Sequence, residues 1–192
     1  MVQGSGRLGS AQRDAGDGGF SMIATMLSMV AVAVLVGLLL ASTFHSGSTS
    51  SGTAGNQQVA LADSLQAQQS LSTGLHAAED AAAVAGGLAS VDAATLSASE
   101  PSVTFVSGPS TGPTTVSVAT GSTAEGTGEA TLTDRSSDGT CWVVWSSPSS
   151  PTWYGAQTGQ SSCTAPALSG PPTPGPVSGS AIGWQQGAFP TA

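Results

Sequence analysis

Few side chains in this chain of 192 amino acids are of the types that carry out catalysis. Its two histidines are His45, which follows a long apolar run, and His76, which lies in a polar segment of helical pattern. Neither is spaced to form a Ser-His-Asp arrangement or a pair of metal ligands, and the sequence contains no P-loop and no nucleophile elbow. We therefore expect no enzyme activity, no metal and no cofactor.

The remaining candidate chemistry lies in two cysteines, Cys141 and Cys163. An even count in an extracytoplasmic chain indicates one disulfide, whereas in the cytosol the same pair would stay reduced. The state of this pair therefore depends on the compartment, which the N-terminal region has to decide.

Aromatic residues cluster around the first cysteine. Trp142, Trp145, Trp153 and Tyr154 could line a sugar-binding or other interaction surface. Aromatic side chains on a strand and its neighbouring loop are more often part of a core, and we favour that interpretation.

Charge is scarce and mostly negative. Charged residues make up 7% of the chain, lysine is absent, and the net charge is −8. The arginines are Arg7, Arg13 and Arg135, so one arginine faces nine acidic residues after Gly19. Binding a phosphate backbone requires many basic side chains, and we expect no direct binding of nucleic acid.

An uncharged, proline-free run extends from Phe20 to Phe44. As a helix it would be about 37 Å long, enough to cross a hydrocarbon core of about 30 Å. A buried helix would need an apolar shell that the polar, glycine-rich remainder cannot supply. A secretory signal is the second alternative, but the run is too long, the preceding residues have no net positive charge, and "LLLASTFHSG" is a poor cleavage site. We expect a single membrane span.

The border "GDGGFSMIAT", residues 16–25, joins a polar leader to this run. A leader that ends in glycine, followed by phenylalanine and a long apolar helix, resembles the signal of type IV pilins and type II secretion pseudopilins. The resemblance implies that a prepilin peptidase cleaves between Gly19 and Phe20 and that the new Phe20 amine is methylated. It departs from the family at the fifth mature position, where Ala24 replaces the usual glutamate.

The segments after the membrane span change from helical to alternating patterns. Residues 45–56 form a Gly/Ser/Thr linker, itself a departure from the family, in which the first helix usually continues into the domain. A helix is expected from there to the Gly86-Gly87 pair, and a short one follows, capped by Asp92 and closed by Pro101. The apolar stripe of the longer helix consists of Leu61, Leu65, Leu71, Leu75, Ala78 and Ala82. His76 is expected on its surface.

Four runs rich in β-branched or aromatic residues, separated by turn signals, predict a four-stranded antiparallel meander packed on the helix. They are residues 102–106, 114–120, 129–134 and 140–147. Cys141 lies in the last run, and Cys163 follows a predicted loop that holds Trp153 and Tyr154. Three residues near the C-terminus, Ile182, Trp184 and Phe189, could add an edge strand, dock on the sheet or belong to a loose tail, and we favour docking.

The expected fold class is therefore α+β and resembles a type IV pilin, with a long N-terminal helix, a small antiparallel sheet and a disulfide-bounded C-terminal loop. "ASEPSVTFVSGPSTGPTTVSVAT" and "DGTCWVVW" are similar to pilin domains of high-GC Gram-positive bacteria. The expected parts are a leader (1–19), a transmembrane or filament-core helix (20–44), the linker (45–56), a globular domain (57–165) and a Pro/Gly-rich tail (166–192).

The resemblance implies a filament subunit of a type IV pilus or pseudopilus. It would be a single-pass membrane protein with an extracytoplasmic C-terminal domain, assembled through its apolar helix with other pilin subunits into a cell-surface filament. The alternative is a membrane-tethered binding or adhesion module that never polymerises, with the linker as its stalk.

Processing can be tested at the leader. We expect Gly19→Val to block cleavage, because the added side chain prevents close approach of the backbone to the peptidase. Mass spectrometry of the mature protein should find a methylated Phe20 at the N-terminus of the native chain and an intact leader in the variant. A mature terminus within residues 41–45 would instead indicate a secretory signal.

Overall fold

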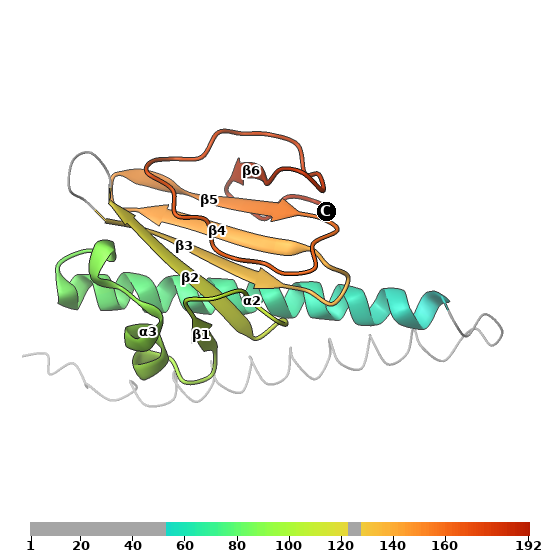
Figure 1. The fold of residues 1–192 in the computed structure, drawn as a ribbon, viewed down its shortest axis with the longest axis horizontal. Coiled ribbons are helices and arrows are strands. Elements are labelled where there is room, and N and C mark those ends of the chain that lie inside the picture. The colour runs from blue at the N-terminus through green and yellow to red at the C-terminus, as the bar shows by residue number, and fades with distance from the viewer. Residues whose placement is uncertain (1–52, 123–127) are drawn as a thin grey trace, which may run out of the picture. The chain divides into compact units, whose positions relative to one another are not determined.

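The computed structural model describes residues 53–122 and 128–192 (Figure 1). The predicted leader, the apolar run and most of the linker lie outside these residues. Within the described ranges, no helix is both long and apolar enough to cross a membrane.

The described domain contains three helical segments and six strands. The helical segments are α2 (Thr53–Ala85), the 3₁₀ turn η1 (Leu88–Ser90) and α3 (Ala93–Ser99). The strands are β1 (Thr104–Val106), β2 (Thr115–Ser122), β3 (Gly128–Arg135), β4 (Cys141–Ser147), β5 (Ser150–Gln157) and β6 (Gly183–Gln186). They form one sheet in the order β1-β2-β3-β4-β5-β6, with α2 lying along one face (Figure 1).

Helix α2 ends where the sequence predicts. Gly86 has a φ of 84°, and the amides of Gly86 and Gly87 both donate to the carbonyl of Ala82 at 2.9 Å, which caps the last turn. The predicted cap of α3 is also present, since Asp92 Oδ1 accepts a hydrogen bond from the Thr95 amide at 2.8 Å. The helix begins at Thr53, so the last residues of the predicted linker are helical.

The predicted apolar stripe of α2 is correct only in part. Leu71, Leu75 and Ala78 are buried against the sheet, but Leu61 and Leu65 are 63% and 58% exposed. In the N-terminal half it is Ser64 and Ala67 that are buried instead. The exposed and buried leucines lie on different faces of the helix, because the six-residue step from Leu65 to Leu71 turns it by about 240°.

The sheet is mixed, not antiparallel as predicted. β1 runs parallel to β2, and every other neighbouring pair is antiparallel. The segment 107–114 returns the chain to the starting end of β1 and is held at two points. Ser70 Oγ of α2 donates to the Pro113 carbonyl at 2.9 Å, and the Ser110 amide donates to the Cys163 carbonyl at 2.7 Å. Both hydrogen bonds join the segment 107–114 to residues distant in the sequence. The short connections from which the antiparallel sheet was predicted contain no information about such contacts.

The segment predicted as a loop with Trp153 and Tyr154 is a strand, β5. It pairs with β4 through Ser147↔Ser150 and Trp145↔Trp153, with a register shift between these pairs. Pro151 lies in this bulge, where its missing amide hydrogen removes no ladder hydrogen bond. The prolines of "SSPSSPT" suggested a loop, but a bulge accommodates one of them within the strand.

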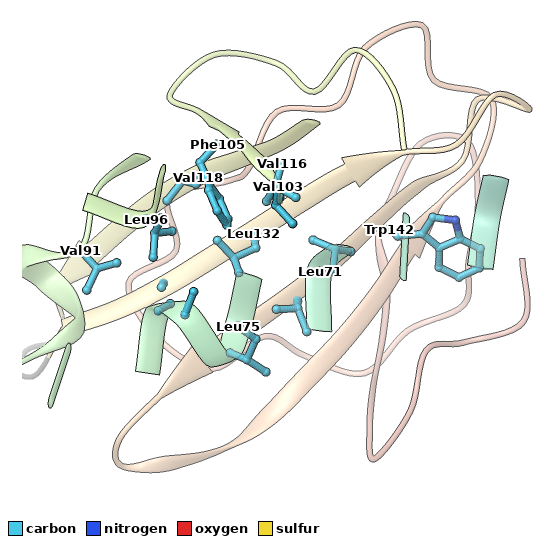
Figure 2. Packing of buried hydrophobic residues seen from close by; sticks show 14 of the residues in the cluster. Leu71, Leu75, Val91, Leu96, Val103, Phe105, Val116, Val118, Leu132 and Trp142 are labelled. Carbon is cyan, nitrogen blue, oxygen red and sulfur yellow. The ribbon is translucent and has the colours of Figure 1, made fainter. Parts of the chain in front are cut away.

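The larger part of the core lies between the sheet and the helices. Leu71 and Leu75 from α2 and Leu96 from α3 meet Leu132 and Phe105 from the strands (Figure 2). Gly74 allows this close packing, because a Cβ atom there would lie 3.0 Å from Cε1 of Phe105. Glycine within α2 thus lets an aromatic ring lie directly against the helix.

Residues 163–182, which we call the C-terminal strap, cover the opposite face of the sheet through Leu168 and Ile182, while Val177 packs against the helix-side core. The Ala165 amide donates to Ser117 Oγ at 2.9 Å, and Gln160 Nε2 donates to the Gly179 carbonyl at 2.7 Å. After the strap, β6 pairs with β5 as an edge strand. The favoured interpretation that the C-terminal residues dock on the sheet is therefore confirmed, and the domain extends beyond its predicted end at residue 165.

The contrast along α2 gives a matched pair of variants. We expect Leu71→Ala to lower the free energy of unfolding by about 2–5 kcal/mol, because it leaves a cavity under a fully buried side chain. Leu65→Ala, the same change on the exposed face of the helix, should change it by no more than about 0.5 kcal/mol. Urea unfolding followed by tryptophan fluorescence measures both, and equal losses would contradict the position of α2 on the sheet.

Candidate functional site

The sequence-predicted site residues fall into two groups. Gly19 and Phe20, the predicted processing and methylation sites, and Ala24 at the fifth mature position lie outside the described residues. The cysteines and the aromatic residues lie in the sheet. His76 is on the surface of α2 as expected, with a side chain 78% exposed and Nδ1 located 3.7 Å from Glu79 Oε2.

Cys141 and Cys163 form a disulfide, with their Cα atoms 5.5 Å apart. Cys141 is in β4, as predicted, and Cys163 begins the C-terminal strap. Next to the bond, Ser110 and Cys163 form a β-bridge between the β1–β2 connection and the strap. The disulfide therefore fixes the start of the strap to the centre of the sheet.

The predicted aromatic cluster is divided between the two faces of the sheet, because successive strand residues point in opposite directions. Trp142 and Tyr154 lie on the helix side. Phe189 packs on both of them edge-on, with ring centroids 5.7 Å and 5.0 Å away. The C-terminal residues thus reach round to the helix side of the sheet and close it there.

The other tryptophans lie under the strap. Trp145 and Trp153 are cross-strand partners, and Trp184 of β6 joins them with Leu168 and Ile182 of the strap packed against the cluster. Trp145 is fully buried, and Trp153 and Trp184 are 9% and 8% exposed. These rings form a second apolar cluster of the core. They present no open stacking surface for a sugar.

A polar residue that the sequence interpretation missed is Asp134, which is fully buried in β3. Its Oδ1 accepts hydrogen bonds from the Arg135 amide at 2.6 Å and from Ser110 Oγ at 3.1 Å, while Oδ2 has no partner. Burial raises the pKa of this carboxyl to about 8, against the opposing effect of those two hydrogen bonds. Asp134 follows Ala130 and Leu132 at alternate positions of β3, and this spacing was the sequence signal that could have predicted its burial.

The buried polar groups of the described domain are not grouped as metal ligands. Residues 53–122 and 128–192 contain no group of three or more His, Cys, Asp or Glu side chains placed to hold a metal ion. The buried polar groups instead connect the β1–β2 segment, the sheet and the strap. What this site does is hold three parts of the chain together next to the disulfide.

Comparisons with protein-family models, with curated proteins and with solved structures give no match.

The disulfide gives a first prediction at this site. Replacing both Cys141 and Cys163 with serine should lower the free energy of unfolding by about 3 kcal/mol, because the bond closes a 22-residue separation in the unfolded chain. Denaturant unfolding measures this loss. Thiol labelling of the native, unreduced protein should detect no free thiol at either position, and labelling of both would contradict the bond.

Asp134 predicts a pH dependence. Below about pH 4 its carboxyl is protonated in both states, and between about pH 4 and pH 8 only the folded state retains the proton. The free energy of unfolding should therefore fall as the pH rises through this interval, by up to about 1.4 kcal/mol per unit. Asp134→Asn should remove most of the fall, since an amide is neutral and accepts the same hydrogen bonds.

Two other carboxyl groups bear on that measurement, Glu129 as a second contributor to the fall and Asp92 as the control. Burial also raises the pKa of Glu129, which accounts for a smaller residual slope in the variant. The Thr95 amide lowers the pKa of Asp92, so the contribution of Asp92 is lost only as the pH falls. Asp92→Asn should therefore leave the fall between pH 4 and pH 8 unchanged. An unchanged fall in Asp134→Asn would contradict the assignment to Asp134.

Proposed function

We propose that this protein is a minor structural subunit of a type IV pilus or pseudopilus-like filament. In this proposal it is stored in the membrane, cleaved after Gly19 by a prepilin peptidase and assembled through residues 20–44. The observation that carries the proposal is the Gly19-Phe20 junction, placed directly before an uncharged run long enough to span a bilayer.

The described domain is compatible with an extracytoplasmic position. Its disulfide is of the kind that persists in oxidising compartments, and in a small domain with so few charged residues it supplies a large share of the stability.

Assembly in this proposal exchanges contacts with lipid for contacts between helices. The run from Phe20 to Phe44 contains no charged residue, so its transfer from lipid to a helix bundle exposes no charge. The polar domain would face outward from the filament. The partners in this proposal are the membrane and other pilin subunits. The prepilin peptidase is a further partner during maturation.

Ala24 indicates which position the subunit takes. In the family that the sequence resembles, the fifth-position glutamate is thought to pair with the N-terminal amine of a neighbouring, earlier-added subunit. A buried unpaired charge costs several kcal/mol. With alanine, this subunit cannot neutralise the amine of an earlier subunit. The tip makes no such demand because no subunit precedes it, and we place this chain there.

Purified filaments test this proposal. The native chain should be present in substoichiometric amounts at one end, located by antibody labelling and quantified by mass spectrometry. Ala24→Glu should enter the filament body more readily, whereas Ala24→Ser, which adds no charge, should not. A chain that forms most of the filament mass would contradict the tip position. Absence from all filaments, together with a retained leader, would favour the membrane-tethered adhesion module.

A further inference from the structure

A groove opens where α2 ends and β4 turns into β5. It has a volume of about 580 Å³, within the range of sites that hold small ligands or single side chains. Both structures that form it lie at the same end of the sheet (Figure 1). The groove is separate from the disulfide and from Asp134, which lie at the other end of β3.

The walls of the groove are apolar and short. Ala82, Ala83 and Leu88 line it from the helical side, and Pro148 and Pro151 line it from the hairpin. Alanine side chains do not reach across the gap, and the proline rings are held by their own backbone. Leu88 is held in the helix-side core. Neither wall can therefore fill the space by a change of rotamer, and an apolar stem could lie between them.

The helical end of the groove is electronegative. Gly86 and Gly87 both donate to Ala82, so among the described residues the next three carbonyls, of residues 83–85, accept no backbone hydrogen bond. The last turn of α2 contains no basic residue to balance the negative end of the helix dipole. The half-exposed carboxylate of Glu79 adds a full negative charge to the lining.

A serine of β4 lines the same space. Ser146 lines the groove and is 6% exposed, yet its hydroxyl donates no hydrogen bond to any described residue. It is on the side of β4 that faces α2, since its neighbours in the alternation, Val144 and Trp142, belong to the helix-side core. This hydroxyl can therefore contribute a hydrogen bond to a ligand in the groove.

The domain supplies no cation of its own to this groove. Arg135 is the one arginine in the described residues, and its Nε donates to the Gln160 carbonyl at the opposite end of β3. His76 Nδ1 lies 3.7 Å from Glu79 Oε2, and both side chains are exposed. A pair of this kind neutralises little of the negative charge of Glu79. In a second copy of the domain that arginine is held by its own Gln160 carbonyl in the same way, so the cation has to come from a different protein.

We propose that this groove binds an arginine or lysine side chain presented by a different protein. The alkyl stem would lie between the alanine and proline walls, and the cationic head would meet Glu79 and the free carbonyls of the helix end. The proposal is independent of the filament assignment, because it rests on the described domain alone.

Peptide binding to the full-length protein in detergent micelles tests this inference. The probe is an acetylated, amidated alanine pentapeptide with a central arginine, and the matched peptide has glutamine there. Calorimetry or fluorescence anisotropy should detect binding of the arginine peptide and at least tenfold weaker binding of the glutamine peptide. Equal binding of the two peptides, or no binding of either, would overturn the proposal.

Three variants locate the site. Glu79→Gln should weaken binding about three- to fivefold, the scale expected of a half-exposed charge pair. Asp80→Asn removes the same charge from the adjacent residue, which does not line the groove, and should change affinity by less than about twofold. Ala83→Phe should abolish binding by filling the space, with the disulfide and the thermal transition retained as evidence of folding.

The outcomes separate a local site from general attraction to an acidic protein. Equal weakening by Glu79→Gln and Asp80→Asn, or unchanged binding to a folded Ala83→Phe variant, would place the interaction elsewhere. Argininamide alone serves as the last probe. If it binds as tightly as the peptide, the groove is a site for small amines, and the assignment to a partner protein is wrong.

Discussion

Strand β4 must be covered on both faces, and the remainder of the domain is arranged around that requirement. All seven of its residues are buried. Its helix-facing side carries Trp142 and Val144, which the helices cover, and its other side carries Val143 and Trp145, which the C-terminal strap covers. A sheet with two apolar faces needs two covering layers. In this chain the second layer is an irregular segment rather than a helix.

An irregular layer has little regular hydrogen bonding of its own, so its position depends on individual anchors. The disulfide fixes its first residue to β4, the Ser117 hydroxyl holds Ala165, and β6 fixes its end to β5. Asp134 lies among these anchors and accepts a hydrogen bond from Ser110, which itself bridges to Cys163. Burial among these anchors raises the pKa of the Asp134 carboxyl, so the folded state favours its neutral form.

The scarcity of basic residues connects the two proposals. The described domain has one arginine and no lysine, so its acidic side chains have few partners within the chain. At the end of α2 this leaves Glu79 and the helix carbonyls next to an open groove. In residues 20–44, the absence of any charge suits a helix that moves from lipid into a bundle. The chain would thus use different partners at its two ends, helices of other subunits at one and a basic side chain at the other.

The sequence by itself determined the features that depend on neighbouring residues. Gly86-Gly87 as the end of α2 and Asp92 as a cap were predictable because a cap acts within one turn. Alternation located β2, β3 and β4, and the even number of cysteines made one disulfide possible in an oxidising compartment. Tertiary structure decided the features that depend on distant residues. The parallel pairing of β1 relies on Ser70 and Cys163, and Pro151 is tolerated in β5 by a bulge opposite β4. Leu65 is exposed while Leu71 is buried, because the sheet covers the helix face that holds Ala67 and Leu71 and not the one that holds Leu65. The groove likewise exists only because the chain brings the end of α2 to the β4–β5 hairpin, and no local pattern contains that contact.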